Sequence, residues 1–325
     1  MDVLPWIEKY RPKSLNDILS HHDIVTSMKN FIKTSSLPNI LFHGPPGTGK
    51  TSVITACIKE IYGKDINTMV MDLNASEERG IDTVRVRIKK FVTCENVFAK
   101  KNHKFKIVIL DEIDSMTDDA QCILRKIIEE NTKNARFCLI CNYFNKINEA
   151  LRSRCICFKF RPLKKENIIQ KIEHIIEEEN LDLDKNAINT LINRSKGDMR
   201  KVLNILQSTS MLDKKIRSDT INNCIGYPLK SQMKYILEEL LHNNDREKAS
   251  YNVKDYIIDN SISLADVIIE LHEYFYNHIE QYDPTTIAEL FIKLKYIDIN
   301  LSYNTNMKLD IIALVYAVGQ IKKLD

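Results

Sequence analysis

Residues 43–51 of this chain read HGPPGTGKT, and this stretch decides the fold. It follows the apolar run Ile40-Leu41-Phe42 and precedes residues 52–61, whose spacing predicts a helix. A G-x-x-x-x-G-K-[ST] pattern between a strand and a helix is typical of a loop whose backbone N–H groups cradle phosphates. The chain has only 8 glycines in 325 residues, yet three fall in this stretch, which disfavours an incidental glycine turn. We therefore predict a nucleotide-binding loop.

Two side chains at the end of this loop have separate expected roles. Lys50 is placed to reach the β and γ phosphates of a nucleotide, and Thr51 to offer its hydroxyl to Mg²⁺, which prefers oxygen ligands. The ligands expected are therefore a nucleotide and Mg²⁺. The residues of this stretch expected at the nucleotide are Gly44, Pro45, Pro46, Gly47, Thr48, Gly49, Lys50, Thr51 and Ser52.

On both sides of the loop, apolar strand patterns alternate with helical patterns. We expect strands at residues 39–42, 69–74, 105–110, 136–142 and 155–160, and helices at 23–33, 52–61, 82–91 and 118–130. Strands that are apolar on both faces and alternate with helices predict an α/β fold with a doubly wound parallel sheet. Such a sheet binds ligands at the carboxyl ends of its strands, where Lys50, Asp111 and Asn142 all lie.

Three polar residues at these strand ends are candidates for catalysis. Asp111 ends an apolar strand, a position that lies beside the phosphate loop in such folds and can hold the water shell of Mg²⁺. Glu112 follows it and can be the base that orients a water for attack on the γ phosphate. Asn142 can hold that water or sense the γ phosphate, although an asparagine that only caps a turn is an open alternative.

Length and composition indicate a globular protein of two or three domains, with 44% hydrophobic and 28% charged residues. No apolar run approaches the roughly 18 residues of a membrane span, and the N-terminus lacks a signal-peptide pattern, so we expect no membrane association. The eight cysteines are expected to stay reduced. A zinc site from Cys138, Cys141, Cys155 and Cys157 is disfavoured, because positions i and i+3 of an extended chain point to opposite faces.

Beyond Pro162 the apolar spacing becomes helical throughout. We expect three domains: an ATP-binding α/β domain at residues 1–161, a small helical lid domain at 162–226 and an all-α domain at 227–325. Of the net charge of +3, residues 231–325 contribute −6, so the last domain is not expected to touch nucleic acid. Periodicity alone does not decide whether that domain is a self-contained bundle or an assembly domain.

Several basic residues outside the loop have two possible interpretations. Arg154, before the last strand, and Arg200, at the start of a later helix, either contact phosphates or are ordinary solvated arginines. Residues 79–106 hold nine Lys+Arg against two acidic residues, and Arg85 and Lys89 share one helical face. That face either follows a phosphate backbone or is simply solvated.

The first residues, 4–12, read LPWIEKYRP, with two prolines around aromatic residues. Because the residue before a proline is driven out of the helical region, we predict a fixed extended arm here rather than a helix.

Taken together, these motifs resemble the small subunits of replication factor C, sliding-clamp loaders of the AAA+ ATPase class. The likeness extends from Leu4 to about Lys230 and more faintly beyond. The stretches that carry it are residues 4–12 (LPWIEKYRP), 44–51 (GPPGTGKT), 73–82 (LNASEERGID), 109–112 (ILDE), 153–155 (SRC) and 197–200 (GDMR).

The resemblance implies roles that spacing does not give. Ile7 and Arg11 would line the adenosine, with Leu19 also at the nucleotide. Asn142 would be sensor 1, and Arg200 would be sensor 2.

Other roles that the resemblance implies lie between subunits. Arg154 would be a finger that reaches the ATP of the adjacent subunit, so active sites would lie at interfaces. Arg79, Arg85 and Lys89 would face DNA phosphates, and the last domain would be a collar that joins five subunits.

The function implied is an ATPase subunit whose ATP-bound form opens a sliding clamp and grips primer-template DNA in the nucleus, during replication and repair. The partners implied are the other loader subunits of a hetero-pentamer, the clamp and the DNA. Two alternatives stay open: a nucleotide-binding scaffold subunit with little turnover, and another AAA+ remodeller. Intact Lys50, Thr51, Asp111 and Glu112 favour the ATPase.

Overall fold

The computed structural model describes residues 4–76, 81–94, 105–243, 245–303 and 306–321, although the side chains of residues 81–85 are outside this description. The chain divides into two compact units, residues 1–214 and 215–325. The finer division at 161/162 and 226/227 that the sequence indicates stays a prediction. Within the described ranges, no helix is both long and apolar enough to cross a membrane.

A five-stranded parallel sheet organises the first unit, in the order β2-β3-β4-β1-β5. Its strands are β1 (Ile40–His43), β2 (Val70–Asn74), β3 (Lys106–Asp111), β4 (Ala135–Cys141) and β5 (Ile156–Lys159). This confirms the α/β fold, and each strand lies within a residue or two of its predicted range. Because β1 pairs with β4, the loop after β1 and the residues after β4 meet at the same edge.

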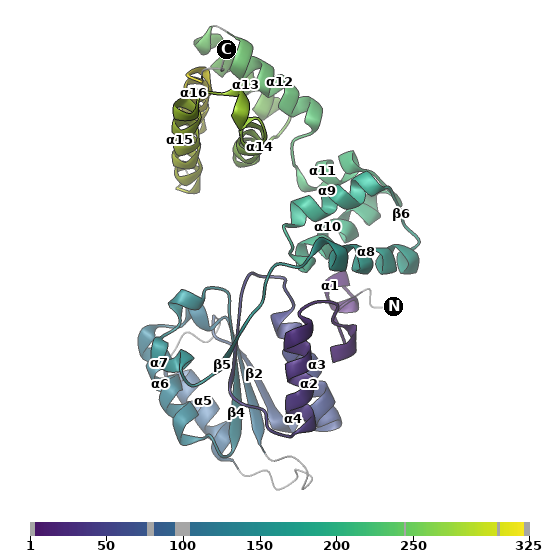
Figure 1. Ribbon diagram of the computed structural model, residues 1–325, viewed down its shortest axis with the longest axis vertical. Coiled ribbons are helices and arrows are strands. Elements are labelled where there is room, and N and C mark those ends of the chain that lie inside the picture. The colour runs from purple at the N-terminus through teal and green to yellow at the C-terminus, as the bar shows by residue number, and fades with distance from the viewer. Residues whose placement is uncertain (1–3, 77–80, 95–104, 244, 304–305, 322–325) are drawn as a thin grey trace. The chain divides into compact units, whose positions relative to one another are not determined.

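Helices cover both faces of this sheet (Figure 1). On one face lie α2 (His22–Lys33) and α3 (Lys50–Tyr62), packed on β1 residues such as Phe42. On the other lie α5 (Ile81–Thr93), α6 (Asp118–Glu130) and α7 (Glu149–Arg152), packed on Leu41 and its neighbours. Alternate strand residues enter opposite cores, which explains why the strands are apolar throughout.

The N-terminal segment corrects one expectation. Residues 4–12 were expected to be extended, but α1 (Trp6–Lys9) is a short helix. The extended prediction was wrong because Pro5 and Pro12 restrict only the residues before them, and a proline is well tolerated at a helix start. Pro5 is the N-cap residue here, and its carbonyl accepts the N–H of Lys9.

Three longer helices follow the sheet in this unit, as the helical spacing predicts: α8 (Lys165–Glu179), α9 (Lys185–Ser195) and α10 (Met199–Leu212). Together we call them the lid helices. The remaining elements of the unit are η1 (Leu15–Asp17), η2 (Gly63–Asp65), α4 (Ile66–Met69), η3 (Ile113–Ser115), η4 (Phe144–Lys146) and β6 (Asp182–Leu183).

The second unit is helical and has its own apolar core. Large apolar side chains also remain exposed at helical spacing on its last two helices: Ile292, Tyr296, Ile299 and Tyr303 on α15 and its C-terminus, and Leu309, Ile312 and Tyr316 on α16. The elements of the unit are β7 (Lys215–Ile216), α11 (Ser218–Ile225), α12 (Lys230–His242), α13 (Arg246–Asp259), α14 (Leu264–Asn277), η5 (Ile279–Gln281), α15 (Pro284–Ser302) and α16 (Met307–Gly319).

Candidate nucleotide-binding site

The loop between β1 and α3 has a backbone that only glycine adopts easily. Gly44, Gly47 and Gly49 all have positive φ angles, of 144°, 66° and 95°. Space also requires glycine at two of them, because a Cβ on Gly44 would lie 2.1 Å from the carbonyl oxygen of Phe160 and one on Gly47 would lie 1.6 Å from Oδ1 of Asp198. The loop ends at Gly49, the N-cap of α3, and the unpaired backbone N–H groups at this helix N-terminus favour an anion.

Lys50, the first residue of α3, is buried inside the loop. Its Nζ donates to the carbonyl oxygens of Gly44 at 2.7 Å and Pro45 at 2.8 Å, and to Oδ1 of Asn142 at 2.9 Å. Burial lowers the pKa of Lys50, and the positive charge of Arg200 acts in the same direction while Asp111 opposes it. The ammonium group is thus held at the centre of the loop, where phosphates would neutralise it.

Thr51 and Asp111 bring two oxygen donors together. The Thr51 hydroxyl donates to Oδ2 of Asp111 at 2.9 Å, and the other carboxylate oxygen accepts the N–H of Glu112 at 2.9 Å. A hydroxyl beside a carboxylate suits Mg²⁺, a hard cation that takes oxygen ligands. The donor set therefore fits the metal that the sequence predicts.

Glu112 follows Asp111 on the carboxyl side of β3, with its side chain exposed. Its backbone is left-handed, with φ 56°. Residues other than glycine and asparagine rarely adopt this conformation, so the glutamate is held here at a cost in backbone strain.

A second carboxylate, that of Asp114, orients Asn142. Oδ2 of Asp114 accepts the backbone N–H groups of Asn142 at 3.3 Å and Tyr143 at 3.1 Å. These bonds fix the chain just after β4, and they aim the Asn142 amide at Lys50. Asp114 therefore acts on the site through Asn142, a role that spacing in the sequence did not indicate.

These groups share one cavity of about 420 Å³ in the first unit. Most of the nucleotide-site residues predicted from the sequence line it: Ile7, Arg11, Leu19, Pro46, Gly47, Thr48, Gly49, Lys50, Thr51, Ser52, Asp111, Glu112, Asn142 and Arg200. Gly44 and Pro45 contribute through the carbonyl groups that hold Lys50. The structure thus brings together residues separated by almost 200 positions.

The lid helices supply lining residues that the sequence reasoning missed. Asn167 and Lys171 come from α8, and Met199 and Leu203 come from α10. Each pair is spaced i and i+4, so each lies on one helical face. The spacing alone is not diagnostic, because apolar residues such as Met199 and Leu203 on one helical face normally indicate core packing, and polar residues such as Asn167 and Lys171 an ordinary solvated face.

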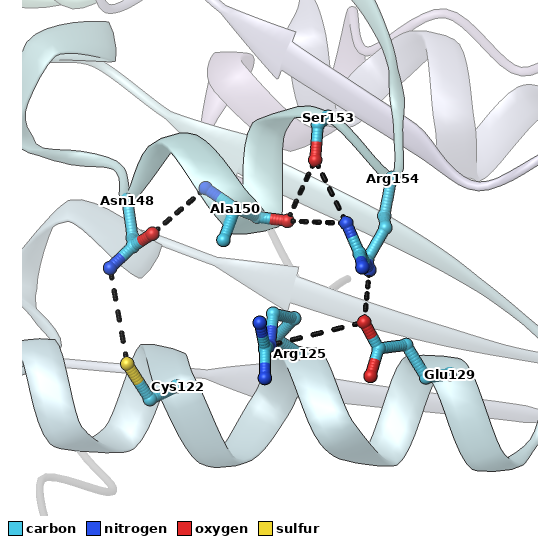
Figure 2. Close-up of polar contacts among 7 residues, drawn as sticks. All are labelled: Cys122, Arg125, Glu129, Asn148, Ala150, Ser153 and Arg154. Carbon is cyan, nitrogen blue, oxygen red and sulfur yellow. Dashed lines mark hydrogen bonds and ion pairs between the residues drawn. The ribbon is translucent and has the colours of Figure 1, made fainter.

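Arg154 is described by the structure but does not line this cavity. It is exposed just before β5, and Figure 2 shows its guanidinium beside Glu129 of α6 and the carbonyl of Ala150. Nε donates to Oε1 of Glu129, and Nη1 donates to Oγ of Ser153 at 2.9 Å. Arg125, one turn before Glu129, approaches the same carboxylate oxygen at 3.9 Å.

Of the three residues predicted to face DNA, the structure describes the side chain of Lys89 alone. Lys89 is exposed on α5, as are its neighbours Arg87 and Lys90. Arg79 and the side chain of Arg85 lie outside the described part of the chain. Their proposed role stays a prediction.

Comparison with known proteins gives two family matches and several relatives. Residues 40–163 match the ATPase family associated with various cellular activities (AAA), and residues 228–317 match the replication factor C C-terminal domain. Replication factor C subunit 5 of Homo sapiens is 44% identical over 315 residues, covering 97% of this chain and 91% of its own length. Replication factor C subunit 3 of Saccharomyces cerevisiae is 41% identical over 320 residues, covering 97% and 93%.

Among solved structures, the Thermotoga maritima RuvB Holliday junction branch migration motor is similar in fold. The TM-score is 0.53 at 14% identity, over 77% of this chain and 91% of that one. At this identity the likeness supports the fold alone.

We predict that Asp114→Ala slows ATP hydrolysis while ATP binding changes little, because Asn142 loses its orientation but Lys50 and the loop remain. A misplacement of about 1 Å at a catalytic group reduces turnover by up to about a hundredfold. The measurement is phosphate release by the chain together with its natural partners. Asp119→Ala, an exposed carboxylate on α6, is the matched control. Equal rates for the two variants would contradict the role of Asp114.

Proposed function

Since this chain belongs to the replication factor C subunits and to the AAA ATPases, we propose that it hydrolyses ATP as one subunit of a clamp loader, which opens a DNA sliding clamp and places it on primer-template DNA. The observation that carries this proposal is the joint arrangement of Lys50, Thr51, Asp111, Glu112 and Asn142 around one cavity. Each of these side chains has a separate part in phosphoryl transfer to water.

Lys50 neutralises charge on the β and γ phosphates, for which it exchanges its present carbonyl partners. Thr51 and Asp111 would hold Mg²⁺, which supplies further charge neutralisation when bound. Glu112 accepts a proton from the attacking water, and Asn142 holds that water or the γ phosphate in line. Arg200, which lines the same cavity from the lid helix α10, would contact the phosphates.

Arg154 supports hydrolysis between subunits rather than within one chain. Its guanidinium lies outside this chain's cavity and is partly exposed, and it would exchange its bond to Glu129 for contact with a neighbour's ATP. An arginine supplied in trans stabilises the charge of the transition state and accelerates phosphoryl transfer by about 10³ or more. This arrangement requires an oligomer in which sites are completed at interfaces, and membership in the replication factor C subunits favours one made of different chains.

The exposed apolar stripes on α15 and α16 support assembly through the second unit. A stripe of Ile292, Tyr296, Ile299 and Tyr303 would be unusual on a self-contained bundle, because contiguous exposed apolar surface marks an interaction site. We therefore favour the assembly domain over the self-contained bundle, with other loader subunits as partners. The nucleus is the location that we propose, because chromosomal DNA is replicated there.

We predict that Glu112→Gln abolishes turnover at this chain's site but preserves ATP binding. Glutamine keeps the size and the backbone but cannot take up a proton, and loss of a general base costs about 10²-fold or more. Phosphate release and nucleotide affinity are measured on the assembled complex, with Glu130→Gln, an exposed residue of α6, as the matched control. An unchanged rate would support the scaffold alternative instead.

We predict that Arg154→Ala lowers phosphate release from the assembled complex, with a loss of about 10³-fold at the site that the arginine completes. ATP binding by the isolated chain should not change, because Arg154 is not part of its own cavity. Arg161→Ala removes another exposed arginine and serves as the control. A loss of ATP affinity in the isolated variant would show that Arg154 acts in cis.

We predict that Lys89→Ala weakens binding of the complex to primed DNA and lowers its salt dependence. Removing one phosphate contact reduces the slope of log affinity against log salt by about 0.9. Fluorescence anisotropy at several salt concentrations measures this slope, and Lys64→Ala, at an exposed lysine of η2, controls for the loss of charge. A slope equal to that of the unmodified complex would remove Lys89 from the DNA-facing surface.

A further inference from the structure

The N-terminal segment is bonded to the lid helices at two points. The backbone N–H of Trp6 donates to Oε1 of Gln207 on α10 at 3.0 Å. At the end of α8, Oε1 of Glu179 accepts from the Tyr10 hydroxyl at 2.6 Å and from Lys9 Nζ at 2.5 Å. Trp6 and Tyr10 are both buried, at 8% and 6% exposure, with their rings edge to face at 5.8 Å.

The same short segment also forms one wall of the nucleotide cavity. Ile7 of α1 and Arg11, two residues beyond the end of this helix, both line it. Trp6 and Lys9 anchor the segment to the lid helices, so one turn of helix faces the lid on one side and the cavity on the other. The residues that line the cavity and the residues bonded to the lid helices therefore belong to the same short segment.

Glu179 is an unusual residue for its place in α8. It is the last residue of the helix, where the negative end of the helix dipole disfavours a carboxylate. The hydrogen bonds from Lys9 and Tyr10 hold the pKa of Glu179 below its usual value, so the group is charged and accepts both donors at neutral pH. Burial together with Glu179 raises the pKa of Tyr10, which therefore remains a donor. The pairing with the N-terminal segment thus offsets an unfavourable helix position.

We infer that Glu179 is a positioning residue for the nucleotide: it fixes the N-terminal segment to the lid helices, so that Ile7 and Arg11 form a wall of the cavity. Arg200 and Gln207 are both on α10, two turns apart, so this helix joins the segment's anchor to the residue at the phosphates. The inference rests on the proposal that the cavity binds ATP. The expected ligand contact of the wall is the nucleoside end of ATP or ADP, since the loop holds the phosphates.

The chain carries a built-in probe of this docking, because Trp6 is its only tryptophan. In the full-length Glu179→Ala variant, Trp6 emission should shift to longer wavelength, and acrylamide quenching should increase. ATP and ADP should both bind about three- to tenfold more weakly, the range for a charge-assisted bond that is partly solvated. Circular dichroism checks that the helices are retained, and Glu177→Ala, an exposed glutamate on the same helix, is the matched control.

Two further variants separate positioning from a general loss of structure. Tyr10→Phe keeps the buried ring and removes only the hydroxyl, so it should give a smaller change in the same direction. In an Arg11→Ala background, Glu179→Ala should weaken ATP binding less than it does alone, because the group that it positions is already missing. Full additivity of the two losses would overturn the positioning role.

The remaining outcomes are distinguishable. Unchanged Trp6 fluorescence in Glu179→Ala would show that Glu179 does not hold the segment. Exposed Trp6 with unchanged ATP affinity would show that the segment does not form the wall, and would also overturn the inference. Absence of ATP binding by the unmodified chain would instead refute the proposed function, whereas the Trp6 measurement would still report on docking.

Discussion

The buried ammonium group of Lys50 is the interaction on which the site depends. A charge in the interior must be paired or hydrogen-bonded, and here two loop carbonyls and the Asn142 amide satisfy it. This requires the loop after β1 and the chain after β4 to meet, which the parallel pairing of β1 with β4 provides. The sheet order, the glycines of the loop and the carboxylate that fixes Asn142 all serve the same contact.

Much of this arrangement could be predicted, because it depends on patterns that are local in the sequence. Continuous apolar runs gave the strands, helical spacing gave α6 at its observed ends, and the glycine loop located Lys50 and Thr51. The short helix α1 was missed, since a four-residue helix leaves no periodicity to detect. A proline disfavours helix only at the residue before it, and the prediction wrongly applied this restriction to the whole of residues 4–12.

The contacts that were not predicted join distant parts of the chain. Glu179 meets Tyr10 across 169 positions, and Arg154 meets Glu129 across 25. No spacing rule connects such residues, because their proximity follows from packing of complete helices. The lid residues Asn167 and Lys171 were missed for a related reason: on a single helix, a pocket-facing side resembles any partly solvated side.

The left-handed backbone of Glu112 sets stability against chemistry at one position. Glycine or asparagine would relieve the strain there, and such strain costs about 1–3 kcal/mol. Either replacement would also remove the carboxylate that follows Asp111, so a change that stabilises the fold here would cost the proposed general base.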